Sequence, residues 1–585
     1  MPLTVEETML NGLPICRGIA IGKPFFLNRE EFKPQELNIN PGDMKIEIER
    51  YRLALSRSKQ DIKRLQRQLE SESSDETIKI LDGQLEMLQD PLLTEEIETE
   101  ICSTEKNAEF VLQNALERFQ KQFEKLGDAY FKERFQDVKD IIRRVTTYLQ
   151  EGRNLSLRDV PPNSIVCAYD LSASDAAEST YGYVKAFITE CGGAASHAGI
   201  VAKAKGIPFL TSVNVNMLKG TQGQMVIVDG RLGKVIINPS QETQTAYEQL
   251  LREIGDQSRT LEERTKWPSE TFDGHRITLS ANIESNKEID LVHQFNGAGI
   301  GLFRSEYIFL PRSEIPDEEE QHQIYSELVE GMRGLPVVIR TFDLAGDKAP
   351  LLGSNTGKSN LFLGGRSTRF LLKQKKVFKE QIRAILRASV KGNVRIMFPM
   401  ISTMQELRQA KSILKESQEE LGLTDPIPIG CMIEVPSAAM IADYFARECD
   451  FLSIGTNDLV QYSLAVDRSD QMQNEFYEPT DPGVIRLIKW IIDQADREEI
   501  PVSVCGEMAS DPRFVPLLLG LGVQELSVTP RALPTIKNAI RNTSIVEAIQ
   551  LAEAALEMAT AKQVLDLLSD EYQKMVPQDL FYNAS

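Results

Sequence analysis

The second half of the chain repeats one pattern, in which short apolar runs alternate with longer amphipathic segments. The runs are Ile277–Ile283, Gly299–Phe303, Pro336–Thr341, Val394–Ile401, Ile429–Val435, Phe451–Thr456, Val502–Gly506 and Val523–Val528. Runs that are apolar throughout are typical of parallel strands buried on both faces. Eight such strands, with helical patterns between most of them over about 300 residues, predict a (β/α)8 barrel.

The first half has strand-like runs at both ends and a helical pattern between them. Apolar residues at Ile48, Tyr51, Leu55, Ile62, Leu65 and Leu69 recur at the intervals that mark one face of a helix. Asp90-Pro91 interrupts the next helical stretch, and we expect helix again over Leu93–Glu124 and Tyr130–Leu149. The strand-like runs are Arg17–Leu27, Ser164–Tyr169, Val184–Thr189 and Met225–Asp229. These patterns predict an N-terminal α/β domain with an inserted helical subdomain.

Together the patterns divide the chain into four parts. Residues 1–27 and 151–240 form the α/β domain, and residues 28–150 form the helical insertion. The polar, helical stretch 241–267 ends at Trp267-Pro268 and is expected to be a linker helix. Residues 268–585 form the barrel. The expected fold class is therefore α/β, with a C-terminal (β/α)8 barrel.

Charge and cysteine content exclude several classes of function. The chain of 585 residues has a net charge of −20, whereas nucleic acids select basic surfaces. Its seven cysteines are scattered, odd in number and without a CxxC pair, which favours reduced thiols over disulfides or a zinc site. The sequence has neither a signal-peptide pattern nor an apolar stretch long enough for a membrane span. We expect a cytoplasmic protein that inserts into no membrane.

The stretch Cys191–Leu210 carries a histidine in a position suited to anion chemistry. Gly192-Gly193 leaves the backbone free of side chains, and Ala198–Lys205 has the composition of a short helix that ends at Gly206. His197 therefore stands where a glycine loop becomes a helix. Unpaired N–H groups and the helix dipole favour an anion there, so an imidazole at this point is suited to carry a phosphoryl group. The alternative is a histidine that is merely packed among small residues.

Polar residues end many of the predicted barrel strands, which is where a barrel places its functional groups. They are Arg304, Arg340, Asp343, Glu434, Asn457, Asp458 and Cys505. Further positive charge comes from Arg468, Arg366 and Lys348, and such a cluster suits a multiply anionic ligand. Glu434 and Asp458 offer two oxygen ligands of the kind that Mg²⁺ combines with substrate oxygens and water. For any single residue of the set, a structural ion pair is the alternative.

Several motifs together resemble enzyme I of the sugar phosphotransferase system, over a stretch from Gly12 to Thr543. The motifs are Gly192-Gly193, Ser196-His197, Gly299–Glu306, Ile339–Asp343, Met397–Met400, Glu434–Pro436, Ser453–Asp458, Leu464–Arg468 and Cys505–Glu507. The resemblance implies a phosphotransferase that moves the phosphoryl group of phosphoenolpyruvate to its own histidine, releases pyruvate, and then phosphorylates the carrier protein HPr.

The resemblance also implies roles for individual residues. By matching motifs, the phosphorylated histidine is His197, the proton donor is Cys505 and the substrate-contacting amide is Asn457. The main substrate-binding arginines are Arg304, Arg340 and Arg468, and the metal carboxylates are Glu434 and Asp458. Arg366 and Lys348 match further substrate contacts. Mg²⁺ is the implied cofactor. HPr is expected to dock on the helical insertion, where Tyr130–Arg134 resembles part of the docking surface, and a homodimer is expected to form through the barrel.

The chain departs from the family pattern in three places. Ala194-Ala195 replaces a large residue and a threonine, the loop Asn360–Arg366 lacks the family's Pro and Trp, and Ala345–Lys348 begins with alanine in place of glycine. Two other functions stay open, the first because of these departures and the second because its enzymes share the histidine and barrel domains. One is a relay that reports phosphoenolpyruvate level through the carrier without sugar uptake. The other is a phosphoenolpyruvate synthase or pyruvate phosphate dikinase, although no stretch before His197 resembles the ATP-binding domain that these enzymes need.

Overall fold

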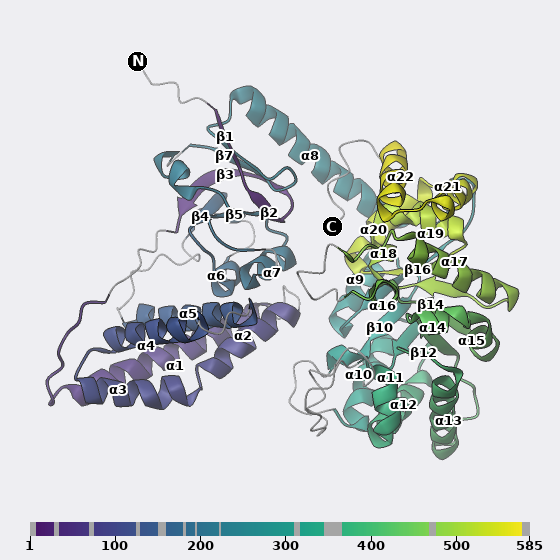
Figure 1. Cartoon of the computed structure of the whole chain (residues 1–585), viewed down its shortest axis with the longest axis horizontal. Helices are drawn as coiled ribbons and strands as arrows, with labels where there is room; N and C mark the ends of the chain where they lie inside the picture. The colour runs from purple at the N-terminus through teal and green to yellow at the C-terminus, as the bar shows by residue number, and fades with distance from the viewer. Residues whose placement is uncertain are drawn as a thin grey trace. The chain divides into compact units, whose positions relative to one another are not determined.

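The chain folds into two compact units, Met1–Glu253 and Ile254–Ser585, which we describe one at a time (Figure 1). The computed structural model describes residues 7–27, 34–69, 75–124, 129–149, 160–179, 183–193, 196–221, 224–308, 316–343, 366–466 and 476–575. Within these ranges, no helix combines the length and the apolar character that crossing a bilayer requires.

A mixed sheet in the first unit contains the strands predicted on either side of the helical insertion. Among the described residues it has eight strands, in the order β1-β8-β7-β3-β4-β5-β6-β2. They are β1 (Thr8–Asn11), β2 (Leu13–Cys16), β3 (Ile19–Phe26), β4 (Ser164–Ala168), β5 (Val184–Thr189), β6 (Phe209–Thr211), β7 (Val226–Asp229) and β8 (Lys234–Ile237). Strand β3 pairs in parallel with β4, so the N-terminal strand joins the part of the chain that follows the helices, as predicted. Strands β1, β2, β6 and β8 lie outside the predicted runs, and each has only three or four residues.

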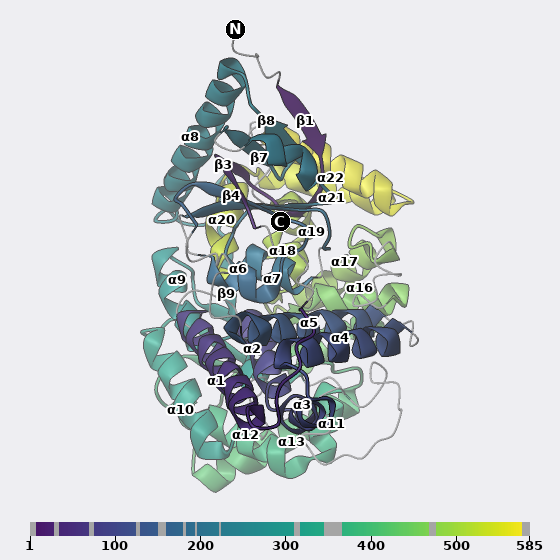
Figure 2. The same ribbon diagram turned by 90° about the vertical axis from the view of Figure 1, so that its left-hand side faces the viewer.

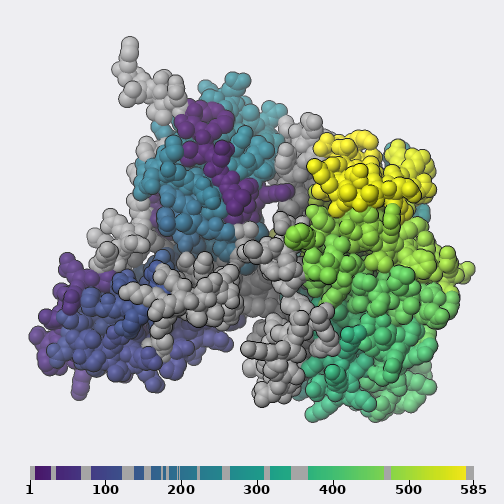
Figure 3. Space-filling model, in the orientation of Figure 1, coloured from purple at the N-terminus to yellow at the C-terminus, as the bar shows by residue number. Residues whose placement is uncertain are grey.

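Helices α1 to α5 of the same unit pack together as a bundle (Figure 2), and their atoms form the purple and blue mass in Figure 3. They are α1 (Met44–Leu69), α2 (Asp75–Met87), α3 (Ile97–Thr104), α4 (Ala108–Glu124) and α5 (Ala129–Leu149). The apolar stripe predicted on α1 is buried at Tyr51, Leu55, Ile62 and Leu65. The helix predicted over Leu93–Glu124 is interrupted, because Glu105 has left-handed backbone with φ 53° and ends α3.

The second unit contains the predicted barrel. Its parallel strands close into a ring, with β9 next to both β10 and β16. The strands are β9 (Thr278–Ile283), β10 (Ile300–Arg304), β11 (Val337–Arg340), β12 (Val394–Phe398), β13 (Ile429–Ile433), β14 (Phe451–Ile454), β15 (Val502–Val504) and β16 (Glu525–Val528). Seven of the eight predicted runs contain one of these strands, and β10 extends one residue beyond its run, so the barrel prediction is confirmed.

Helices surround the barrel and follow most of its strands. They are α9 (Ile289–Gln294), α10 (Glu318–Gly331), α11 (Ser367–Lys373), α12 (Lys375–Ser389), α13 (Met404–Leu421), α14 (Pro436–Met440), α15 (Ala442–Glu448), α16 (Thr456–Leu464), α17 (Pro482–Arg497), α18 (Glu507–Ser510), α19 (Val515–Leu521), α20 (Leu533–Arg541), α21 (Ile545–Glu557) and α22 (Ala561–Met575). The last two helices lie at the surface of the unit, where they are yellow in Figure 3.

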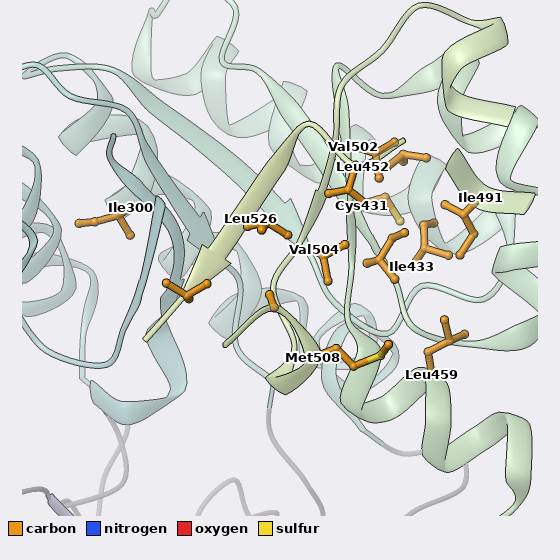
Figure 4. Close-up of a cluster of buried hydrophobic side chains, with 14 of the residues drawn as sticks. Ile300, Cys431, Ile433, Leu452, Leu459, Ile491, Val502, Val504, Met508 and Leu526 are labelled. Carbon is orange, nitrogen blue, oxygen red and sulfur yellow. The ribbon is translucent and has the colours of Figure 1, made fainter. Parts of the chain in front are cut away.

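Side chains of the strands alternate between the surrounding helices and the lumen of the barrel. Leu452, Val502 and Val504 belong to the apolar layer that also holds Leu459 and Ile491 of the helices (Figure 4). The alternate positions face the lumen. A separate buried cluster there consists of Leu302, Val338, Met397, Met432, Phe451 and Cys505.

Helix α8 (Gln241–Arg264) covers most of the stretch in which a linker helix is predicted, and its carboxyl end contacts α20. The buried Lys537 of α20 donates hydrogen bonds from Nζ to the carbonyl oxygens of Thr265 at 2.7 Å and Asn296 at 3.0 Å. Because helix ends leave carbonyl groups without partners, this ammonium group stabilises the ends of α8 and α9 together. Beside it, the Arg541 guanidinium stacks 4.8 Å from the centre of the Trp267 ring.

Candidate active site

The predicted glycine loop and helix occur at His197. Helix α7 (His197–Ala204) begins at this residue, and the Ser196 side chain caps it by accepting a hydrogen bond from the Gly199 N–H at 3.1 Å. Gly192 has φ +122°, a conformation that favours glycine. The His197 side chain and Ala194-Ala195 lie outside what the structure describes. The backbone at this point has the loop-to-helix geometry that favours an anion.

Two arginines at neighbouring strand ends of the barrel each pair with an acidic side chain. Arg304 ends β10 and contacts Glu284 Oε1 at 3.1 Å. Arg340 ends β11, is 7% exposed, and pairs with Glu306 and with Asp343, the latter at 3.2 Å. The Nε atoms of both arginines are buried without a hydrogen-bond partner in the described structure. Each guanidinium therefore keeps a donor for a further acceptor.

Arg366, at the start of α11, joins two carboxylates of the site. It contacts Asp343 at 3.1 Å and Asp458 at 3.0 Å, and it lies 3.4 Å from the Tyr462 hydroxyl. Burial opposes ionisation of Asp343, but the charges of Arg340 and Arg366 outweigh it and hold the pKa of that carboxyl well below its usual range. This part of the site therefore holds charged groups at neutral pH.

Glu434 directly follows β13 and is buried. Unlike Glu306, Asp343 and Asp458, it forms no ion pair with an arginine among the described residues. Its Oε1 accepts a hydrogen bond from the Met400 N–H at 2.7 Å. Burial, together with the negative charges of Asp458 and Asp343, raises the pKa of Glu434 to about 8. Gly455 makes room for it, because a Cβ at 455 would lie 2.7 Å from Glu434 Oε2.

The donor chemistry of this cluster suits a hard divalent cation. Excess negative charge surrounds Glu434, and a cation near Glu434 and Asp458 would neutralise it. The described residues form no group of three or more His, Cys, Asp or Glu side chains that could hold a metal ion by itself. Two protein carboxylates with other oxygens from substrate and water agree with the way Mg²⁺ is commonly bound.

Asn457 and Cys505 lie at the adjacent strand ends. The Asn457 amide is held on both sides by Glu507, whose N–H donates to Oδ1 at 2.8 Å and whose carboxylate accepts from Nδ2 at 3.0 Å. Cys505 directly follows β15 and is 3% exposed. Burial raises the pKa of its thiol, so the sulfur carries a proton at neutral pH. Gly506 lies against α16, where a Cβ would be 1.8 Å from Thr456 Oγ1.

The structure brings most of the predicted barrel residues into one electrostatic cluster. Charges of Arg304, Arg340 and Glu434 all act on Cys505, and Arg366 contacts Asp458. Arg468 and Lys348 lie outside the described residues. Sequence reasoning missed Glu284 and Glu306 as arginine partners. Glu284 immediately follows β9, and Glu306 lies two residues beyond the end of β10. A search for acids as well as bases at strand ends finds them.

Comparisons with known proteins identify domains over most of the chain. Residues 258–545 match the PEP-binding domain of PEP-utilising enzymes, residues 11–134 match their N-terminal domain, and residues 160–233 match their mobile domain. The phosphoenolpyruvate-protein phosphotransferase of Priestia megaterium is 36% identical over 569 residues, which cover 96% of this chain and 99% of that protein.

A second relative gives the same result. The phosphoenolpyruvate-protein phosphotransferase of Bacillus subtilis is also 36% identical over 569 residues, covering 96% of this chain and 100% of that protein. A solution structure of the Enzyme I protein nEIt is 31% identical, covers 41% of this chain and 97% of that chain, and has a TM-score of 0.36. From its domains and from the length and identity of these matches, the chain belongs to the phosphoenolpyruvate-protein phosphotransferase family, a family of enzymes.

Proposed function

We propose that this protein transfers the phosphoryl group of phosphoenolpyruvate to His197, releases pyruvate, and then passes the group to the carrier protein HPr. The observation that carries the proposal is the set of arginines held at the strand ends of the barrel, where the Nε atoms of Arg304 and Arg340 are buried and have no hydrogen-bond partner among the described residues. Phosphoryl transfer needs positioning and charge stabilisation above all, which a fixed set of guanidinium groups supplies.

Arg304, Arg340 and Arg366 would bind the phosphate and carboxylate of the substrate, together with Arg468 and Lys348. The acidic partners Glu284, Glu306 and Asp343 hold the first three guanidinium groups in place before substrate arrives. Such preorganisation reduces the cost of ordering long side chains on binding.

Glu434 and Asp458 would hold Mg²⁺. When bound, the ion supplies positive charge next to the substrate's phosphate and carboxylate oxygens. The protein itself keeps these two carboxylates close together in a buried place, which raises the pKa of Glu434.

Cys505 would protonate C3 of the enolpyruvate leaving group, and Asn457 would donate a hydrogen bond to the substrate. The raised pKa of the buried thiol keeps it protonated, which a general acid requires. The fixed amide orientation of Asn457 follows from its two bonds to Glu507.

His197 belongs to the first compact unit, whereas the barrel residues belong to the second. We propose that residues 1–27 and 151–240 form the phosphohistidine domain, that residues 28–150 dock HPr, and that residues 268–585 bind phosphoenolpyruvate and form a homodimer. The linker helix over 241–267 would then let His197 alternate between the barrel and the carrier.

The test is labelling by ³²P-phosphoenolpyruvate. His197→Ala should abolish the label, because it removes the nucleophile, while His293→Ala should keep it. The His293 ring lies instead beside the Gly331 carbonyl at 2.9 Å and has a structural role. Label that persists in His197→Ala would overturn the proposal.

A further inference from the structure

A chain of hydroxyl groups runs from Cys505 into the lumen of the barrel. Ser453 donates from Oγ to Cys505 Sγ at 3.2 Å, and Ser503 donates from Oγ to Ser453 Oγ at 2.9 Å. Ser453 is fully buried and Ser503 is 7% exposed. The two serines and the thiol therefore form one directed chain of donors.

The chain leads toward a half-buried carboxyl group, that of Glu525. Ser503 and Glu525 are partners in the register of β15 and β16, so their side chains point to the same side of the barrel wall. Val502, Val504 and Leu526 belong to the outer apolar layer (Figure 4), which puts the alternating Ser503 and Glu525 on the lumen side.

Glu525 has the properties of a proton store. Its Oε1 accepts a hydrogen bond from Ser280 Oγ at 2.9 Å, and the charged group near it is Arg395 of β12. Burial raises the pKa of Glu525 despite the Arg395 charge, so the carboxyl group holds its proton more firmly than an exposed one.

We propose that Ser503 and Ser453 relay a proton from Glu525 to the Cys505 thiolate after each turnover. The inference rests on the proposed role of Cys505 as the acid that protonates enolpyruvate. When the S–H bond breaks and the C3–H bond forms, a buried thiolate remains. Ser453 then gives its O–H proton to sulfur, Ser503 gives its own to Ser453, and the Glu525 carboxyl gives one to Ser503. Glu525 regains a proton from water.

The two serines and Glu525 are positioning residues in this scheme, because they act through Cys505 and do not touch substrate. The relay separates the first turnover from later ones. The thiol is already protonated in the resting enzyme, so the first turnover needs no relay, whereas each later turnover does.

The experiment compares one turnover with many in the full-length enzyme. Pyruvate release is followed by rapid quench with phosphoenolpyruvate and Mg²⁺ alone, and in the steady state with excess HPr. Ser453→Ala and Glu525→Gln should release the first pyruvate at the wild-type rate. Their steady-state rate should fall by at least ~10-fold. This loss should be smaller than the ~10²–10⁴-fold loss that is typical of a missing general acid. Because the relay acts after pyruvate has left, kcat/KM for phosphoenolpyruvate should stay near the wild-type value while kcat falls.

Two controls separate a relay from a structural role. Ser453→Thr keeps the hydroxyl and should restore steady-state turnover. Ser527→Ala removes an equally buried lumen hydroxyl, which donates to Asn282 Oδ1 and not to the chain, and should behave as wild type. The relay is wrong if Ser453→Ala and Glu525→Gln each slow the first turnover and the steady state equally. It is also wrong if neither variant slows either phase.

A folding defect or a wrong acid would also be visible. Circular dichroism checks that Ser453→Ala folds. If it does not fold, Glu525→Gln alone tests the relay. This variant should fold, because its amide keeps the oxygen that accepts a hydrogen bond from Ser280. Cys505→Ala tests the proposed function separately. If its first turnover is as fast as wild type, Cys505 is not the acid. If the first turnover of Cys505→Ala is slow while Glu525→Gln has wild-type rates in both phases, Cys505 is the acid and only the relay is wrong.

Discussion

At the scale of single residues, Glu434 shows how burial prepares a site for a cation. Its carboxyl group lies among Asp458 and Asp343, and the resulting pKa of about 8 stands well above the ordinary value of 4.5. A negative charge on Glu434 is therefore unfavourable in the metal-free site, and a bound cation would offset it.

This charge predicts a pH dependence of stability in metal-free protein. The folded chain keeps the Glu434 proton up to a pH of about 8, whereas the unfolded chain loses it near 4.5, so the free energy of unfolding falls as pH rises across this window. Glu434→Gln has no proton to lose there. In thermal melts with chelator, we expect the Tm of the wild type to fall more steeply with pH than that of Glu434→Gln. Parallel Tm curves would contradict the assignment.

Residue identities could be predicted better than residue pairings. Arg304, Arg340, Glu434 and Cys505 stand at the ends of apolar runs, so the strand rule finds them from sequence. The pairing of Arg366 with both Asp343 and Asp458 joins residues 23 and 92 positions apart, and no local pattern encodes it. Ser453 and Ser503 each lie singly inside an apolar strand, where a small polar residue gives no periodic signal.

At the scale of secondary-structure elements, the turn from β14 into α16 shapes the carboxylate site. Gly455→Ala would place a Cβ against Glu434 Oε2. We expect a loss of about 1–3 kcal/mol in the free energy of unfolding, as for other overpacked sites, and a loss of activity from the displaced carboxylate. Urea unfolding and pyruvate release measure the two effects. Gly42→Ala, where no atom lies within 4 Å of the new Cβ, is the control and should change neither.

Lys537 connects the ends of two helices and should matter for stability. Lys537→Met keeps the length of the side chain but leaves the carbonyls of the buried Thr265 and of Asn296 without the ammonium donor. We expect the free energy of unfolding of the second unit to fall by about 1–3 kcal/mol, the cost of unsatisfied buried acceptors. Lys562→Met on the exposed face of α22 serves as the control in the same urea titration. An equal effect of the two substitutions would show that the Lys537 bonds add nothing.

Element types follow from the sequence more readily than element ends do. The β-branched runs of the barrel and the α1 stripe have many residues that repeat the same period, so they are recognised. The break at Glu105 depends on a single left-handed residue that is not glycine, which composition does not reveal.

At the scale of the whole molecule, the division into two units separates the proposed nucleophile from the proposed substrate site. A fragment that ends at Glu253 keeps His197 and the helices α1 to α5 but lacks every barrel residue. We expect it to accept phosphate from phosphorylated HPr and to fail with phosphoenolpyruvate, as measured by ³²P transfer from each donor. Labelling of the fragment by phosphoenolpyruvate would show that the barrel does not bind the substrate.

The tryptophan beside Arg541 gives the molecule an optical reporter of its own. The chain has two tryptophans, and Trp267 follows the end of α8 while Trp490 lies on α17. Trp267 is 50% exposed and stacks against a cation, so its emission depends on both water and that charge. With Trp490→Phe, the tryptophan fluorescence of the protein comes from the end of the linker helix alone. Stopped-flow fluorescence can then follow that helix through the catalytic cycle without an attached dye.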